Sequence, residues 1–209
     1  MPRPKSDIDL RIVHAARDRF LHDGVDGASL RRIARAARTN IGMVYYYFPT
    51  KDDLFLAVVE EVYAQLLGDL ATALAPDAPI ETRLRRLFDR FAAMNEDEFK
   101  VIRLVLREAM VSSRRRARLV ERFFRGHVPL VLSTLGEGIA AGRVESGHPV
   151  PLLAIATLVL AAMPQVGQRL LREQLPAGFP LPDANRIAET MCQILLRGIS
   201  APAQGKMAS

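Results

Sequence analysis

Three consecutive tyrosines, Tyr45, Tyr46 and Tyr47, are the residues of this 209-residue chain whose chemistry points most directly to a partner. Successive side chains on an α-helix point about 100° apart, so at least one of the three rings must face solvent or a ligand. A tyrosine hydroxyl can donate to a phosphate oxygen while its ring lies against a sugar or a base methyl group. The cluster therefore favours contact with DNA, and a small packed core of tyrosines is the alternative.

Two short helices joined by a tight turn would hold this cluster. Ser29 can cap the first helix and Asn40 the second, which we expect to end near Phe48, before Pro49. A helix that enters the major groove needs such a bracing helix before it, and Gly42, which has no Cβ, would let its backbone approach DNA closely. The first helix has an apolar stripe at Leu30, Ile33, Ala34 and Ala37 and carries Arg31, Arg32 and Arg35 on its other face. A solvated arginine face is the alternative interpretation.

The chain shows no catalytic or metal-binding pattern. The four histidines, His14, His22, His127 and His148, fall in separate segments without the spacing of metal ligands. The run Gly136–Ala141 matches G-x-G-x-x-A, but it lies in a helical apolar pattern with no strand before it, which is the wrong context for dinucleotide binding. We therefore expect no enzyme activity, no metal and no cofactor. A helical enzyme or carrier remains the alternative class, with no catalytic constellation to support it.

The composition is that of a globular protein, with 49% apolar and 25% charged residues. A net charge of +6 favours an anionic partner, and the single cysteine, Cys192, excludes a disulfide framework within the chain. The N-terminus lacks the apolar run of a signal peptide. The apolar window Val150–Met163 is shorter than the roughly 20 residues that span a bilayer, and Pro164 is expected to close it. These features predict a cytoplasmic protein outside the membrane.

Helical spacing continues along the rest of the chain without strand-like alternation, so we expect an all-α fold of about nine helices. One helix, ending at Gly24, precedes the turn-linked pair, and Pro129 should kink the helix that contains it. The segment LLAIATLVLAAM has no polar face, which indicates a subunit interface. The later helices are expected at about 50–75, 80–95, 97–110, 113–141, 151–172 and 183–199.

Residues 8–56 resemble the DNA-binding domain of the TetR family of bacterial transcriptional regulators. The resemblance implies a three-helix helix-turn-helix domain at 6–50, with its recognition unit at 29–48, and an effector-binding and dimerisation domain at 51–200. Residues 1–5 and 201–209 are expected to be flexible tails. The matching residues are Ala15, Ala16, Phe20, Gly24, Ser29, Ile33, Ala34, Ala37, Gly42, Tyr45, Tyr47, Phe48, Lys51 and Leu54.

The resemblance also implies roles for single residues. Ser29 matches a hydroxyl residue that contacts a phosphate, and Arg31 matches a position where some members read a base. Tyr47 and Lys51 resemble phosphate clamps. The positions of the recognition helix are Asn40, Ile41, Gly42, Met43, Tyr45 and Tyr46.

Three residues depart from the family's pattern. Arg38 stands where a turn glycine is usual, so it should take the turn conformation at some cost in strain. Thr39 replaces a small apolar residue, and Met43 replaces a threonine. Because Ile41 and Met43 are apolar, we expect them to contact thymine methyl groups rather than to form hydrogen bonds with bases.

Two further groups of residues have two interpretations each. The first would line an effector cavity for a largely apolar molecule, with plain core as the alternative: Phe88, Phe91, Met94, Arg103, Phe123, Phe124 and His127. The second is a basic segment, read as a solvated helix start or, alternatively, as a face for DNA or an anionic ligand: Arg114, Arg115, Arg116, Arg118, Arg122 and Arg125.

Together these features predict a homodimeric, ligand-responsive repressor that binds a palindromic operator. We expect the segments 150–172 and 183–199 to pair across a twofold axis as a four-helix bundle. A small-molecule effector would then favour a state in which the two recognition helices no longer match the operator. An effector-independent activator or an architectural DNA-binding protein is the alternative.

Overall fold

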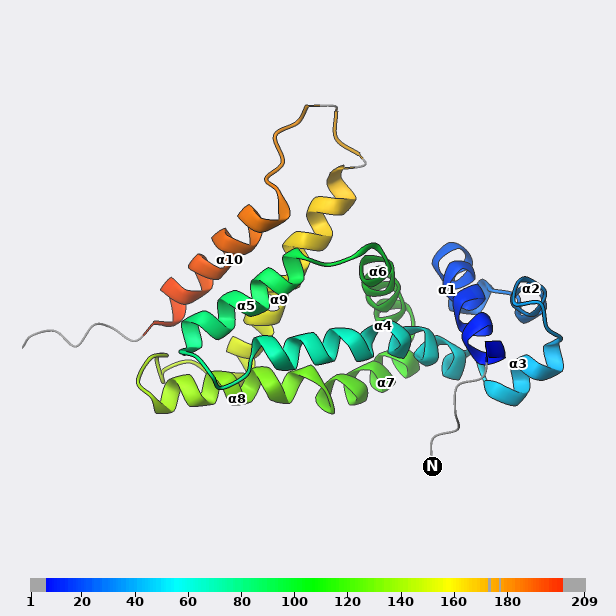
Figure 1. The fold of residues 1–209 in the computed structure, drawn as a ribbon, viewed down its shortest axis with the longest axis horizontal. Coiled ribbons are helices and arrows are strands. Elements are labelled where there is room, and N and C mark those ends of the chain that lie inside the picture. The colour runs from blue at the N-terminus through cyan, green and yellow to red at the C-terminus, as the bar shows by residue number, and fades with distance from the viewer. Residues whose placement is uncertain (1–6, 173, 177, 201–209) are drawn as a thin grey trace, which may run out of the picture. The chain divides into compact units, whose positions relative to one another are not determined.

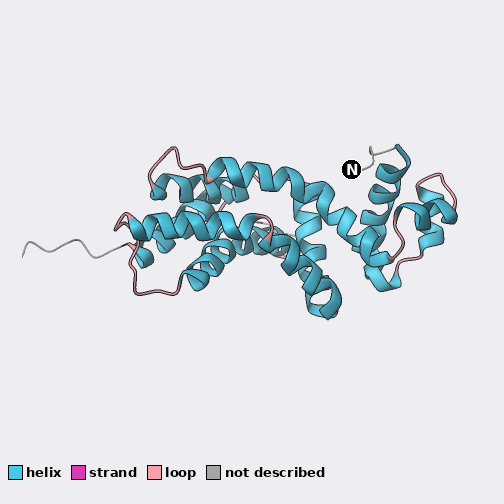
Figure 2. Cartoon of the chain, turned by 90° about the horizontal axis from the view of Figure 1, so that it is seen from below, coloured by secondary structure: helices cyan, strands magenta, loops and turns pink. Residues whose placement is uncertain are grey.

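The apolar spacing of the chain is realised as helices in a computed structural model, which describes residues 7–200 except 173 and 177. Figure 2 shows loops joining the helices, and the described residues contain one isolated β-bridge, between Val144 and Ser200, and no strand. The all-α expectation is confirmed, while residues 1–5 and 201–209 lie outside the described residues. The helices are α1 (Asp7–Gly27), α2 (Leu30–Ala36), α3 (Ile41–Tyr47), α4 (Lys51–Ala73), α5 (Ile80–Ala92), α6 (Glu96–Val111), α7 (Ser113–Phe124), α8 (His127–Ala140), α9 (Val150–Arg172) and α10 (Ala184–Ile199).

The described part has ten helices rather than about nine, because the single helix expected over 113–141 is two helices. The chain breaks at Gly126, and Pro129 falls in the first turn of α8. The amides of a first turn have no intrahelical acceptor, so a proline there removes no helical hydrogen bond. The expectation of a kink at Pro129 was therefore wrong: this proline belongs to a helix start.

The described residues up to Leu66, together with Asn95–Arg122, form one compact unit. In this unit α1 packs against α2, α3 and α6, and α2 packs against α3 (Figure 1). The α1 helix is interrupted at Gly24, whose φ of 75° is open to glycine at little cost. The interior of the three-helix group is apolar and includes Ile12, Ala16, Phe20, Ile33, Ala37 and Val44.

The turn between α2 and α3 is a complete C-terminal capping motif. The Arg38 amide donates to the Arg35 carbonyl at 3.1 Å, and the Thr39 amide donates to the Ala34 carbonyl at 3.0 Å. Arg38 itself has a φ of 52°. This left-handed conformation is the one that glycine usually supplies, so the expected strain at Arg38 is confirmed.

The second compact unit comprises Leu67–Met94 and the described residues from Phe123 onwards. Within it α10 packs against α5 and α9, and α8 packs against α9 (Figure 1). Arg83 is buried and donates to the Leu74 carbonyl and to the Thr134 hydroxyl, both at 3.0 Å. Burial raises the pKa of the Cys192 thiol to about 11, so this cysteine stays a protonated core residue.

The apolar helix α9, Val150–Arg172, has the bounds expected for the helix over 151–172 to within one residue. Pro164 follows the apolar window Val150–Met163, and the helix continues past it. By length and composition α9 could cross a membrane, although about a third of its most apolar window is buried within the chain. Its exposed face carries Leu152, Ile155 and Val159, spaced at helical intervals and 58%, 60% and 49% exposed.

Candidate nucleic-acid interface

Helix α3 presents aromatic side chains outward. Val44 is fully buried and fixes the helix on its core, whereas Tyr45 and Tyr46 are 51% and 57% exposed. The ring of Tyr47 is half-buried between its neighbours, edge-on to Tyr46 with centroids 5.2 Å apart and tilted against Phe48 at 6.3 Å. The alternative of a packed tyrosine core therefore does not hold for Tyr45 and Tyr46, which form an exposed aromatic surface.

Side-chain caps start both helices of the recognition unit. The Asn40 Oδ1 accepts from the Met43 amide at 3.0 Å, and the Ser29 Oγ accepts from the Arg32 amide at 3.4 Å. The space beside Gly42 is tight, since a Cβ there would lie 3.1 Å from Asn40 Oδ1. Gly42 is exposed, so its missing side chain leaves the backbone of the first turn accessible. Ile41 and Met43 are half-buried beside it.

Helix α2 turns its cationic face to solvent. Arg31, Arg32 and Arg35 are exposed, while Ile33 and Ala34 on the opposite face are buried. Arg38 in the turn is exposed as well. No acidic residue lies between Gly27 and Lys51, so the exposed guanidinium groups give this surface a positive character that suits phosphates.

Lys51 already has a partner at the start of α4. Its Nζ donates to the Asp26 carbonyl at 2.8 Å, which ties the beginning of α4 to the end of α1. An ammonium group has three donors, so this contact leaves two for a phosphate. Thr50 and Asp53 form a capping box, with the Thr50 amide donating to Asp53 at 3.1 Å and the Asp53 amide donating to Thr50 Oγ1 at 3.1 Å.

The basic segment of α7 is only in part a solvated helix start. Arg115 is buried, and Arg118 and Arg122 are half-buried against Asp53 and Glu60. Arg114 and Arg116 are exposed, as a solvated face requires. Burial of Arg115 was missed because two of its carboxylate partners, Asp26 and Asp52, lie far away along the chain.

The residues expected to line an effector cavity have several different environments. Phe88, Phe91 and Met94 are buried apolar core residues. The Phe123 ring lies against His127, with centroids 5.0 Å apart. In contrast Phe124 is 61% exposed, and the exposed guanidinium of Arg103 lies 5.4 Å from the Phe99 ring centroid. The lining role of these seven residues stays a prediction.

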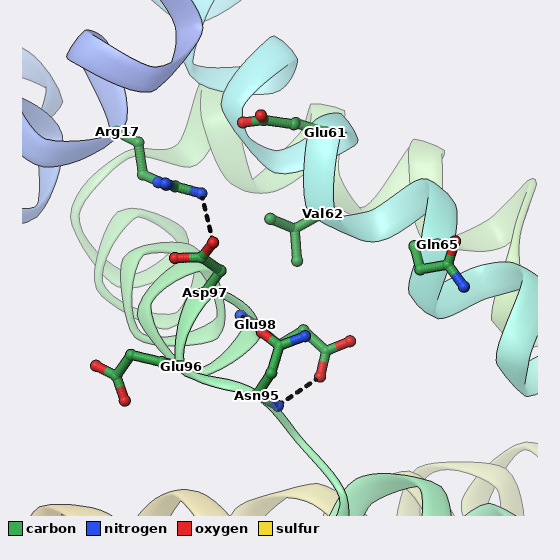
Figure 3. A pocket seen from close by; sticks show the side chains of 8 residues that line it. All are labelled: Arg17, Glu61, Val62, Gln65, Asn95, Glu96, Asp97 and Glu98. Atoms are coloured by element: carbon green, nitrogen blue, oxygen red, sulfur yellow. Dashed lines mark hydrogen bonds and ion pairs between the residues drawn. The ribbon is translucent and has the colours of Figure 1, made fainter.

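A pocket of about 440 Å³ opens between α1, α4 and α6, and all of its lining residues except Val62 are polar or charged (Figure 3). Arg17 reaches across it to Asp97 at 3.2 Å, and the Asn95 amide donates to Glu98 at 3.0 Å. None of the residues expected to line an effector cavity belongs to it. The lining residues are Arg17, Glu61, Val62, Gln65, Asn95, Glu96, Asp97 and Glu98.

Comparison with known proteins relates this geometry to a family. Residues 12–58 match the model of bacterial regulatory proteins of the tetR family. The chain is 30% identical over 152 residues to the HTH-type transcriptional repressor SCO4008 of Streptomyces coelicolor, covering 72% of this chain and 74% of that protein. It is 22% identical over 153 residues to the fatty acid metabolism regulator protein of Bacillus subtilis, covering 72% and 76% of the two chains.

The fold also resembles a solved structure along most of its length. The crystal structure of the transcriptional regulator FadR from Bacillus subtilis in complex with stearoyl-CoA superimposes with a TM-score of 0.74. The match covers 91% of this chain and 98% of that one, at 19% sequence identity. At this identity the likeness concerns the fold.

Proposed function

This chain belongs to the TetR family of bacterial regulatory proteins, and from that premise we propose that it represses transcription as a homodimer that a small-molecule effector releases from its operator. The observation that carries the proposal is the exposed face of α3. A capped helix that displays Tyr45 and Tyr46 beside an arginine-bearing helix has the residue types that a major groove accepts.

Contacts with DNA divide into positioning and reading. Ser29, Tyr47 and Lys51 supply donors for phosphates, and such contacts fix the register of a protein on the duplex without reading sequence. Arg31, exposed on α2, can bind the O6 and N7 atoms of guanine with two hydrogen bonds. The remaining reading positions are those of α3 and its cap: Asn40, Ile41, Gly42, Met43, Tyr45 and Tyr46.

Pairing of two chains is supported by α9 and α10. Besides Leu152, Ile155 and Val159, α9 exposes Leu170 and Leu171, and Ile194 on α10 is 53% exposed. Large exposed apolar side chains gathered on one part of a protein mark a contact with another protein surface. A four-helix bundle formed by α9 and α10 from each chain would bury these side chains. The resulting dimer is proposed to act in the cytoplasm.

The effector is proposed to be a small, largely apolar molecule that binds in the second half of the chain. Support comes from the buried aromatic and methionine side chains of this region, Phe88, Phe91 and Met94. Phe123 and His127, which contact each other, would add an aromatic and a polar group to the lining. An effector that binds one conformation of the protein more tightly than another is sufficient to shift operator occupancy.

The proposal can be tested by selecting binding sites from a library of random duplex DNA. The wild-type protein should enrich one sequence and bind it in a gel shift. The double variant Tyr47→Phe with Lys51→Ala should bind all duplexes more weakly, because phosphate contacts are lost, and the magnitude of the slope of log affinity against log salt should fall by about 1, because one cation is removed. Failure of the wild-type protein to enrich any duplex at low salt would exclude the regulator function.

A further inference from the structure

One buried guanidinium in the compact unit that contains α1–α3 contacts three carboxylates from three other helices. The Arg115 side chain is 4% exposed, and its Nη atoms donate to both oxygens of Asp26 at 2.9 and 2.8 Å. It also donates to Asp52 Oδ1 at 3.1 Å, and its Nη2 lies 2.9 Å from Glu108 Oε2. Asp26 belongs to the end of α1, Asp52 to the start of α4 and Glu108 to α6. Arg115 on α7 therefore joins four helices at one point.

The same corner carries further contacts between α6 and α1. Glu108, 3% exposed, accepts from the Val25 amide at 3.3 Å and from Arg107 Nε at 3.3 Å. Arg107 also donates to the carbonyls of Leu21, at 3.1 Å, and Phe20. Phe20 and Leu21 precede the break of α1 at Gly24, and Val25 follows it. The end of α1 is therefore held by polar contacts to α6 and α7.

Helix α7 is fastened along α4 in addition. Arg118 reaches Asp53 at 2.9 Å, and Arg122 binds both carboxylate oxygens of Glu60 at 2.7 Å. The Arg122 guanidinium also lies 4.5 Å from the centroid of the Tyr63 ring. Because these contacts anchor α7 to α4, the position of Arg115 relative to α4 is fixed where it binds Asp26.

The charge balance of this cluster depends on Arg115. Without its guanidinium, Arg107 is the cation left in contact with the buried Glu108, and Asp26 and Asp52 lie at the same corner as like charges. Asp52 keeps a second ion pair, with the exposed Arg114 at 3.3 Å. The hydrogen bond from Arg115 holds the pKa of Asp26 below its ordinary value, so Asp26 stays ionised at neutral pH. Lysine cannot replace arginine here, because an ammonium group lacks the planar fork that serves several carboxylates at once.

We propose that Arg115 is a positioning residue for operator binding, which sets the orientation of α1–α3 on α6 and α7 by holding Asp26, Asp52 and Glu108. The inference rests on the proposed function, in which two recognition helices must match half-sites about one helical turn apart. A dimer reads that spacing only if each α3 is held in a fixed orientation. Arg115 touches no base, and its contribution is to spacing selectivity.

The test measures affinity for duplexes whose half-sites are moved one base pair apart or together from the site that the wild-type protein selects. One base pair rotates a half-site by about 35°, so the wild-type protein should lose about tenfold in affinity, or about 1.4 kcal/mol. In Arg115→Met and Arg115→Lys the spacing ratio, which is the affinity for the selected site divided by the affinity for the shifted sites, should fall towards one. The affinity for the selected site should also fall. The spacing ratio of Asp26→Asn should lie between those of these variants and that of the wild-type protein.

Three controls separate positioning from folding. Arg116→Met changes an exposed neighbour on α7 and should leave the spacing ratio unchanged. Asp26→Asn alters a side chain that is 73% exposed, so it tests the cluster even where Arg115→Met does not fold. In the free protein, hydrogen exchange at the amides of residues 21–27 should accelerate in Asp26→Asn and Arg115→Lys by more than in α2, whereas a general loss of stability would raise both alike.

Unchanged spacing ratios in Asp26→Asn and Arg115→Lys would overturn the inference, and so would unchanged exchange at residues 21–27. These results are distinct from a failure of the proposed function. If the wild-type protein selects no DNA, the regulator proposal fails, and the exchange measurement still decides whether Arg115 holds the end of α1.

Discussion

Helices α3 and α9 both expose large side chains to solvent, but of different kinds. The exposed residues of α3 are tyrosines, each with a hydroxyl at the end of an apolar ring. Those of α9, Leu152, Ile155 and Val159, are aliphatic and have no polar atom to offer. A ring with a polar tip suits a wet, charged surface such as DNA, whereas an aliphatic stripe suits a dry contact with another apolar surface. The two exposed faces therefore call for two different partners.

The two helices also differ in how they are supported. Helix α3 has seven residues, one fully buried side chain and a side-chain cap, whereas α9 has 23 residues and a long buried face. Most of the stability of a helix in a protein comes from packing of its apolar face. Substitutions in α3 should therefore change the free energy of DNA binding by small amounts, and substitutions in α9 should change the free energy of dimerisation by large amounts.

The largest effect is expected from Ile155→Asp on α9. A carboxylate placed in the centre of an apolar dimer contact should weaken dimerisation by about 4 kcal/mol or more, roughly a thousandfold, because the charge is desolvated once in each subunit. Sedimentation equilibrium should then show monomers at micromolar concentration, with operator binding lost as well. Thr82→Asp, an exposed substitution in the first turn of α5, should leave the dimer intact. A dimeric Ile155→Asp variant would show that α9 does not form the interface.

The next effect belongs to the α2 face beside α3. Arg31→Ala should relax specificity at one base pair of each half-site by about 1–3 kcal/mol, since a bidentate contact with guanine is lost. Affinities for duplexes substituted at every position of the selected site measure this. Arg32→Ala removes an equally exposed neighbour and should leave the base preference unchanged. Equal base preferences in the wild-type protein and Arg31→Ala would remove Arg31 from the reading surface.

The N-caps of α3 and α10 give a matched pair of substitutions. Asn40 accepts from the Met43 amide and Asp183 accepts from the Arg186 amide, so either change to alanine should lower the free energy of unfolding by about 1 kcal/mol. Only Asn40→Ala should also weaken operator binding, because it frees the first turn of the reading helix. Chemical denaturation and gel shifts compare the two variants. Equal operator affinity in both would place α3 outside the interface.

The smallest effect concerns Arg38 in the turn before α3. Arg38→Gly relieves a left-handed conformation and should stabilise the protein by up to about 1 kcal/mol, or about 2–4 °C in Tm. Arg35→Gly makes the same change within α2, where glycine lowers stability by about 1 kcal/mol. Thermal unfolding of the two variants should therefore move in opposite directions. A lower Tm for Arg38→Gly would mean that its side chain stabilises the fold.

Short-range features of the molecule could be predicted from the sequence. Ser29 and Asn40 cap their helices as expected, because a cap depends on residues two or three positions away. The strained turn at Arg38 follows in the same way from an arginine at a position that favours glycine. The exposure of Tyr45 and Tyr46 follows from helix geometry together with the burial of Val44.

Long-range features could not be predicted in the same way. Arg115 meets Asp26 and Asp52 across 89 and 63 residues of sequence, and nothing local distinguishes it from the exposed Arg114 and Arg116. The outward position of Phe124 was missed because an aromatic residue in a helical stripe favours burial as a rule. The break at Gly126 was missed because Pro129 was interpreted as a kink in a longer helix.

We propose that two copies of this chain, paired through α9 and α10, read DNA with α3. The most direct measurement is selection from random duplex DNA, followed by sedimentation of the selected complex to count its chains. We expect an enriched inverted repeat whose half-sites lie about one or more whole helical turns apart, bound by an even number of chains. Enrichment of a sequence without twofold symmetry, or its tight binding by a single chain, would exclude DNA reading by a dimer of this kind.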